Sequence, residues 1–183
     1  MTQDVLWMEE TYFKDNSILN ENVDWRVVQP ILILVQDRYI LPILGTALFD
    51  EIADEIEAAS VSTLNETLLN LYLRKAIIWF TLSELAPILK NKYQNKGVMV
   101  RNSENSQPAD RESIQADQAN FKQQGEMYAE RATRYLRENE SSYPNFFAST
   151  INGDDILPNV NNYTSSLYLG DSDCDECKEN FYK

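Results

Sequence analysis

The spacing of apolar side chains predicts a chain that is mainly α-helical. In the stretch NVDWRVVQPILILVQDRYILPILG, apolar residues recur every three or four positions and so share one helical face. They are Trp25, Val28, Leu32, Val35 and Tyr39. Pro42 and Gly45 are expected to end this first helix. A second amphipathic helix is predicted from about Thr46, with its acids on a solvated face.

Two further helices complete a predicted four-helix core. The third begins with a capping box formed by Thr63 and Glu66 and becomes apolar on nearly all sides, as a central helix does. The fourth runs from about Ala109 to Asn139, and it is long and very polar. Its apolar stripe falls seven residues apart, at Ile114, Phe121, Tyr128 and Tyr135. Gly125 and Ala132 are small enough to let a neighbouring helix approach closely.

The connection between the third and fourth helices, KGVMVRNSENSQPADRES, is longer than the two to eight residues usual between helices. Val98, Met99 and Val100 predict a short β segment within it. A single strand leaves its backbone groups unpaired, so we expect it to pair with the next copy or with a partner by strand addition. The alternative is that the three apolar residues cover the domain's own core.

Charge divides the chain into a body and two arms. The net charge is −13. Residues 1–24 hold six acids and one Lys, residues 25–137 hold fourteen acids and thirteen bases, and residues 138–183 hold nine acids and two Lys. We therefore expect an N-terminal arm over 1–22, a helical domain over 23–147 and an acidic, extended C-terminal arm over 148–183. The acidic ends repel phosphates and argue against sequence-specific reading of nucleic acid.

Few residues offer catalytic chemistry. The chain has no His, and its five Gly are too dispersed for a phosphate-binding loop. We predict no catalytic, cofactor-binding or metal-binding residues and no enzymatic activity. Cys174 and Cys177 form a lone CxxC, for which tail composition and an inter-subunit metal or redox role both stay open. No apolar run approaches the length of a membrane span, and the N-terminus lacks the basic region of a signal peptide.

Two other groups of residues are candidates for contact with a partner. Arg131, Arg134 and Arg137 form a basic edge at the end of the fourth helix, where cations are favourable in any case. The alternative is that they dock an acidic surface, such as the acidic arm of a neighbouring copy. The segment YPNFFAST closes the folded part of the chain. With the β segment, it gives the predicted interface residues, which are Val98, Met99, Val100, Arg131, Arg134, Arg137, Tyr143, Phe146 and Phe147.

Several short pieces of residues 20–147 carry a resemblance to a known family. They are Gln29-Pro30, Val35-Gln36-Asp37, the turn LPILGTALF from Leu41 to Phe49, Gly97-Val98, Tyr135-Leu136 and Tyr143-Pro144. Together they resemble the head-to-tail connector adaptors of tailed bacteriophages, most closely the ring proteins of crAss-like phages. Neither terminal arm takes part in the resemblance.

The resemblance implies a structural virion protein without catalytic activity. Such adaptors form a ring, commonly dodecameric, below the portal protein; the ring extends the DNA channel and provides a platform for tail proteins. The implied partners are further copies of the chain, the portal protein and other connector or tail ring proteins. DNA would pass through without sequence-specific binding. The implied location is the virion, after assembly in the host cytoplasm, with no membrane contact.

Two other functions compete with this expectation. One is an acidic monomeric binding or inhibitor protein that mimics DNA and acts on a host enzyme. Its acids would follow one continuous surface, whereas here they gather at the two ends. The other is an enzyme that uses carboxylates and a divalent metal. It needs acids on facing helices, whereas the acids from Asp50 to Glu57 are expected on one outer face.

Overall fold

The computed structural model describes residues 5–19, 23–94, 97–100, 111–148 and 156–158, with no side-chain description for 90–100. Within these ranges the protein is mainly helical, as predicted. Its α-helices are α1 (Glu10–Asp15), α2 (Trp25–Val35), α3 (Leu41–Leu44), α4 (Thr46–Glu57), α5 (Thr63–Leu68), α6 (Arg74–Lys90) and α7 (Arg111–Glu138). π-Helical turns η1 (Gln36–Ile40) and η2 (Leu69–Leu73) join helices, and 3₁₀ turns η3 (Glu140–Ser142) and η4 (Pro144–Phe146) follow α7. The strands are β1 (Asn91–Gln94) and β2 (Gly97–Val100).

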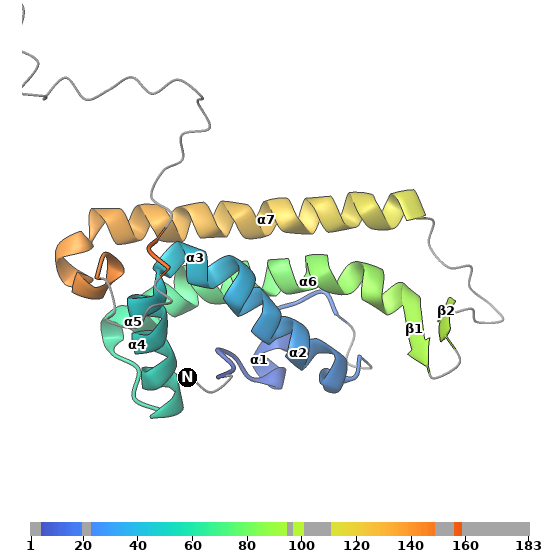
Figure 1. Cartoon of the computed structure of the whole chain (residues 1–183), viewed down its shortest axis with the longest axis horizontal. Coiled ribbons are helices and arrows are strands. Elements are labelled where there is room, and N and C mark those ends of the chain that lie inside the picture. Colours follow the sequence, from blue (N-terminus) through green and yellow to red (C-terminus); the bar gives the residue numbers. More distant parts are fainter. Residues whose placement is uncertain (1–4, 20–22, 95–96, 101–110, 149–155, 159–183) are drawn as a thin grey trace, which may run out of the picture.

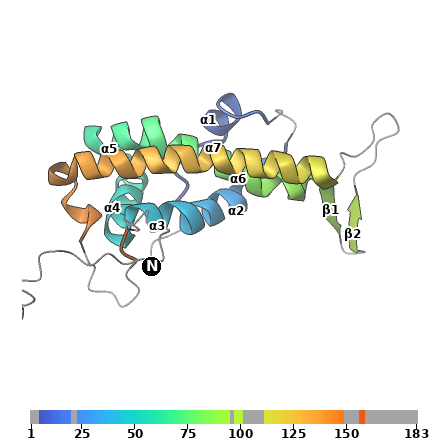
Figure 2. The ribbon, with the colours of Figure 1, turned by 90° about the horizontal axis from the view of Figure 1, so that it is seen from above.

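The molecule is elongated along α6 and α7, which lie side by side (Figure 1). The strands β1 and β2 lie at one end of this pair, and α4 and α5 lie toward the other (Figures 1 and 2). Seen from above, α2, α3 and α4 lie on one side of α7, and α5 lies on the opposite side (Figure 2).

The first predicted helix runs without a break through α2, η1 and α3 and ends at Gly45, as expected. The Asp24 side chain accepts a hydrogen bond from Arg26 N at 3.0 Å and so caps its start. Pro30 does not end the helix. Gly45 has φ of +75°, which favours glycine, and a Cβ there would lie 2.7 Å from Pro158 Cδ.

By length and composition alone, the helix from Trp25 to Leu44 could also cross a membrane. The prediction from the sequence concerned uninterrupted apolar runs, whereas this helix also contains polar and charged residues such as Gln36, Asp37 and Arg38. Val28, Leu32 and Val35, however, are buried against the rest of the protein. A single helix of this kind is weak evidence, because core helices of soluble proteins have the same composition.

The cap of helix α5 lies one residue earlier than predicted. Ser62, and not Thr63, accepts a hydrogen bond from the backbone N–H of Asn65 at 3.3 Å. The Ser62 backbone N–H in turn donates to Glu55 Oε2 at 3.1 Å. The capping box predicted from Thr63 and Glu66 is therefore replaced by a cap that connects α5 to α4.

The helices α6 and α7 approach each other closely at Gly125. A Cβ at this position would lie 2.7 Å from Phe80 Cδ1, so only glycine fits without a shift. The fully or nearly buried residues of α7 are Gly125, Ala129, Ala132 and Leu136. The predicted close approach at Gly125 and Ala132 is confirmed. Phe121, Tyr128 and Tyr135 instead line one flank of the contact and are only half-buried.

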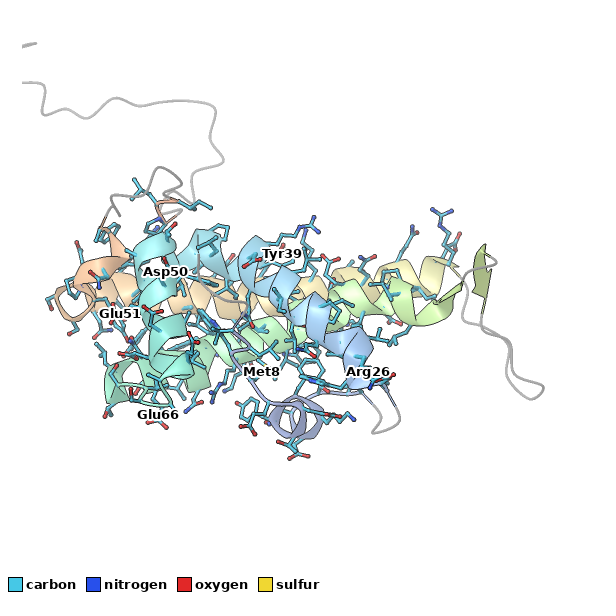
Figure 3. The ribbon with its side chains drawn as sticks, turned by 60° about the horizontal axis from the view of Figure 1, so that its bottom comes forward. Met8, Arg26, Tyr39, Asp50, Glu51 and Glu66 are labelled. Carbon is cyan, nitrogen blue, oxygen red and sulfur yellow. The ribbon has the colours of Figure 1, made fainter. Side chains whose placement is uncertain are left out.

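Residues 5–15 are part of the folded body and not an arm outside it. Trp7, Met8 and Phe13 belong to the hydrophobic core, and Met8 is labelled in Figure 3. The buried Gln36 side chain accepts from Trp7 N at 3.2 Å and donates to Val5 O at 2.8 Å. The sequence concealed this role because a short helix and a loop together have no single hydrophobic period. Residues 16–19 of the predicted arm are also described, and residues 1–4 and 20–22 lie outside the described residues.

Candidate functional site

The predicted β segment pairs with residues of its own chain. β2 lies antiparallel to β1, with Asn91 opposite Val100, Lys92 opposite Met99 and Tyr93 opposite Val98. The sequence placed Asn91–Gln94 at the end of the third helix, but α6 ends at Lys90 and the chain turns back as a hairpin. The expectation of a strand without a partner in its own chain is therefore wrong. In the part of the chain that the structure describes, the outer edges of both strands are not paired.

The three arginines of the predicted basic edge spread around α7. Arg131 lies over two rings, with its guanidinium carbon 5.6 Å from the centres of both Tyr72 and Tyr128. Residues three apart are offset by about 60° around a helix, so Arg134 points farther outward and Arg137 turns to the other flank. All three side chains are exposed. Arg131 and Arg137 are thus about 120° apart around α7, with Arg134 midway between them, so the three side chains do not form one narrow edge.

Two of the three predicted aromatic interface residues are buried in the chain's own core. Tyr143 and Phe146 are almost fully buried, while Phe147 is 42% exposed. Tyr143 also donates a hydrogen bond to Leu64 O at 3.0 Å, and burial raises the pKa of its hydroxyl. The motif YPNFF thus fastens the end of α7 to α5, and Phe147 alone stays available to a partner.

The acids of α4 are more than a solvated face. Glu55 Oε2 accepts from Asn65 Nδ2 at 2.9 Å, and the same amide nitrogen lies 3.3 Å from Glu51 Oε1. Glu51 Oε2 accepts from Asn145 Nδ2 at 2.7 Å. Asp50 and Glu51 lie on α4, and Glu66 lies on the neighbouring α5 (Figure 3). These contacts join α4, α5 and η4, and no group of acids or thiols within the described residues has the geometry of a metal site.

A second polar contact joins η1 to α6. The Tyr39 hydroxyl donates to Glu84 Oε1 at 2.7 Å, and Arg38 Nη1 lies 3.2 Å from the same oxygen. Burial, followed by the hydrogen bond to Glu84, raises the pKa of Tyr39 to about 12. The Tyr39 ring stacks on Phe80 with centres 4.2 Å apart. The group stays protonated at neutral pH and positions two helices.

A shallow depression of about 360 Å³ lies beside α5 and η2. Its lining consists of Ile56, Ala59, Val61, Glu66, Leu69 and Arg74. Arg74 is already engaged, because its Nε donates to Trp7 O at 3.1 Å and its guanidinium lies 5.1 Å from the Tyr12 ring centre. This depression therefore offers little free polar chemistry for a ligand.

Four of the exposed apolar side chains form two pairs with a spacing of seven residues. Val27 and Leu34 lie seven residues apart on α2, and Leu34 is 48% exposed. Leu64 and Leu71 lie seven apart on α5 and η2, and Leu71 is 47% exposed. The sequence analysis missed both pairs as surfaces, because a residue's place in an apolar stripe does not show which stripe is covered.

Within the described residues, the fold is that of a mainly helical protein with exposed apolar positions on α2, α5 and η2. Residues 40–156 match a family of unknown function, DUF6712. The match covers more than half of the chain, so the chain belongs to this family. No match was found among curated proteins or among solved structures.

Proposed function

We propose that the protein is a structural virion protein that forms a ring in the head-to-tail connector of a tailed bacteriophage. In this proposal a ring of twelve copies lies below the portal protein, extends the DNA channel and carries tail proteins. Its folded unit is a four-helix core with the β segment as a connector between subunits. The protein has no enzymatic role and acts in the virion after assembly in the host cytoplasm.

The observation that carries the proposal is the hairpin of β1 and β2 at the end of the α6–α7 pair (Figure 1). An unpaired strand edge at the end of an elongated body is a template for another strand. Strand addition supplies backbone hydrogen bonds between chains without a catalytic or ligand-binding pocket. The proposal therefore assigns the open edge of the hairpin to a neighbouring copy or to a portal segment.

Two further features support a ring. The exposed pairs Val27/Leu34 and Leu64/Leu71 lie on helices on opposite sides of α7 (Figure 2). Two different surfaces on opposite sides permit a head-to-tail contact, which closes into a ring when the rotation allows. The net charge of −13 also suits a wall past which DNA slides, since phosphates are repelled.

The proposal is tested by the mass of the protein alone and with portal protein. Subunits of 21.2 kDa give a twelve-copy ring of about 250 kDa. We expect a closed ring, or co-sedimentation with portal protein, by native mass spectrometry and sedimentation. A monomer in the absence of portal protein does not decide the matter, because ring proteins can assemble only on their neighbour. A monomer that ignores virion proteins and binds a host nuclease tightly favours the inhibitor function instead.

The hairpin's part in assembly is tested by proline substitutions. Successive N–H groups of a strand point to opposite edges, so one of Val98→Pro and Met99→Pro removes a donor from the outer edge. We expect that variant to keep the helical circular dichroism spectrum and to lose assembly. Met99→Leu keeps the backbone donor and serves as the matched control. If both proline variants formed normal rings, the hairpin would have no role in contacts between subunits.

A further inference from the structure

A group of aromatic and cationic side chains covers one flank of the contact between α7 and the η2–α6 segment. Tyr72 and Tyr135 have ring centres 5.2 Å apart. Arg131 lies 5.6 Å from the ring centres of Tyr72 and Tyr128, and Lys75 Nζ lies 5.7 Å from the Tyr128 ring centre. These five residues, Tyr72, Lys75, Tyr128, Arg131 and Tyr135, are called the tyrosine–cation face below.

The charges of this face point to solvent while its rings are half-buried. Lys75 and Arg131 are exposed, and the three tyrosines are of intermediate exposure. Neither cation belongs to an ion pair recorded among the described residues. The rings hold the two cations in place, since a cation over an aromatic ring is attracted by the ring's electrons. The face therefore presents ordered positive charge beside aromatic and apolar surface, including the exposed Leu71.

The chain itself contains a segment of matching chemistry. Residues 171–179, DSDCDECKE, hold five acids and one Lys, and Tyr168, Phe181 and Tyr182 flank them. Carboxylates pair with exposed cations, and aromatic side chains add contact area against tyrosine rings. Nucleic acid is the less suitable occupant, because a chain of net charge −13 repels phosphates.

Residues 156–158, the last described residues before the acidic segment in the sequence, lie on the side of the molecule opposite to this face. Ile156 accepts from Thr46 N through its carbonyl and donates its N–H to Thr46 Oγ1, both at 2.9 Å, which fixes residues 156–158 at the start of α4. Tyr72 belongs to η2, which follows α5 directly, and it packs against Tyr135 of α7, so the tyrosine–cation face lies on the α5 side. α5 and α4 lie on opposite sides of α7 (Figure 2).

We propose that the acidic segment 171–179 of one copy binds the tyrosine–cation face of the next copy. The exit point on one side and the receiving face on the other form a head-to-tail pair of surfaces. The residues between Pro158 and Asp171 can span on the order of 40 Å when extended, which is enough to reach a neighbour. The arrangement between copies rests on the proposed ring.

Zero-length cross-linking of the full-length chain tests this inference. A carbodiimide joins an amine to a carboxylate that touches it, so Lys75 reports on its acidic neighbours. Assembly of equal amounts of ¹⁴N- and ¹⁵N-labelled protein makes links between copies visible by mass spectrometry as mixed-isotope peptides. We expect mixed-isotope links from Lys75 to the acids of 171–179. Arg131→Glu should reduce them by about fivefold, because it replaces attraction by repulsion.

Arg137→Glu is the matched control, because it makes the same change of charge on the other flank of α7 and should leave the links unchanged. If Lys75 were linked to residues 171–179 only in same-isotope peptides, the segment would bind within its own copy, which would overturn the inferred binding between copies. Links from Lys75 to Asp54 or Glu57 of α4, or no links, would overturn the assignment of the acidic segment. Loss of the links on addition of a short DNA duplex would assign the face to phosphates instead.

The same samples separate this inference from the proposed function. Their native mass shows whether rings have formed. Closed rings without links between Lys75 and residues 171–179 would contradict the inferred contact and still support the proposed ring. Mixed-isotope links in open oligomers, without closed rings, would contradict the proposed ring and still support the inferred contact between copies.

Discussion

Replacement of Gly125 by alanine tests the close contact between α7 and Phe80 of α6. The new Cβ would lie 2.7 to 2.9 Å from three atoms of the Phe80 ring. An ordinary carbon–carbon contact is about 3.5 to 4.0 Å, so α7 or the ring must move by roughly 0.8 Å. Phe80 is nearly fully buried and stacked on Tyr39, so its ring has little room to move.

Two opposing terms decide the sign of the effect. Alanine favours the helix over glycine by about 1 kcal/mol. Overpacking of a buried contact costs about 1 to 3 kcal/mol. We therefore expect Gly125→Ala to lower the free energy of unfolding by about 1 kcal/mol in urea denaturation followed by circular dichroism. Ala119→Gly, at an exposed position of the same helix, isolates the helix term and should destabilise by a similar amount.

A double-mutant cycle with Phe80→Leu identifies the cause. Once the ring is shortened, Gly125→Ala should become neutral or stabilise by up to about 1 kcal/mol, a coupling of about 1 to 2 kcal/mol. Equal stabilisation by alanine in both backgrounds would show that the helices do not meet closely at Gly125 and would refute this account of the core.

Three further changes probe the core and its polar contacts. The Tyr39 hydroxyl has a pKa of about 12 in the folded state and about 10 in the unfolded state, so the free energy of unfolding should fall as the pH rises from about 10 to about 12. Tyr39→Phe should flatten that fall when urea unfolding is measured at several pH values. Glu55→Ala removes the acceptor of three hydrogen bonds and should cost about 1 to 3 kcal/mol by thermal or urea unfolding. Glu57→Ala, on the exposed side of α4, should stay within about 0.5 kcal/mol, and equal effects would contradict the structural role of Glu55. Phe13→Ala should cost about 3 to 5 kcal/mol because the side chain is fully buried, whereas a residue of an outer arm would change stability little.

Regular helices could be predicted because their burial follows a fixed period. Val28, Leu32 and Val35 share a face in the sequence and share the core in the structure. Gly125 also stood out, because a small residue in a polar helix has few purposes other than close packing. By contrast, the residues around Trp7 and Phe13 form part of the core through a loop and a short helix, which have no common period.

The candidate contact residues were harder to predict, because surface contacts depend on residues distant in sequence. Arg131 meets Tyr72 across two helices, a pairing that no spacing within either helix reveals. Tyr143 and Phe146 were placed at an interface because they follow the last helix, yet the chain folds back and buries them. The hairpin was missed because residues Asn91–Gln94 continue a helical pattern until the chain reverses.

The mass of the protein assembled with portal protein tests the central claim most directly. Native mass spectrometry should show a closed ring of identical 21.2 kDa subunits, about 250 kDa for twelve copies, bound to the portal protein. The account would be contradicted if the protein remained a monomer in the presence of portal protein and was not found in purified particles.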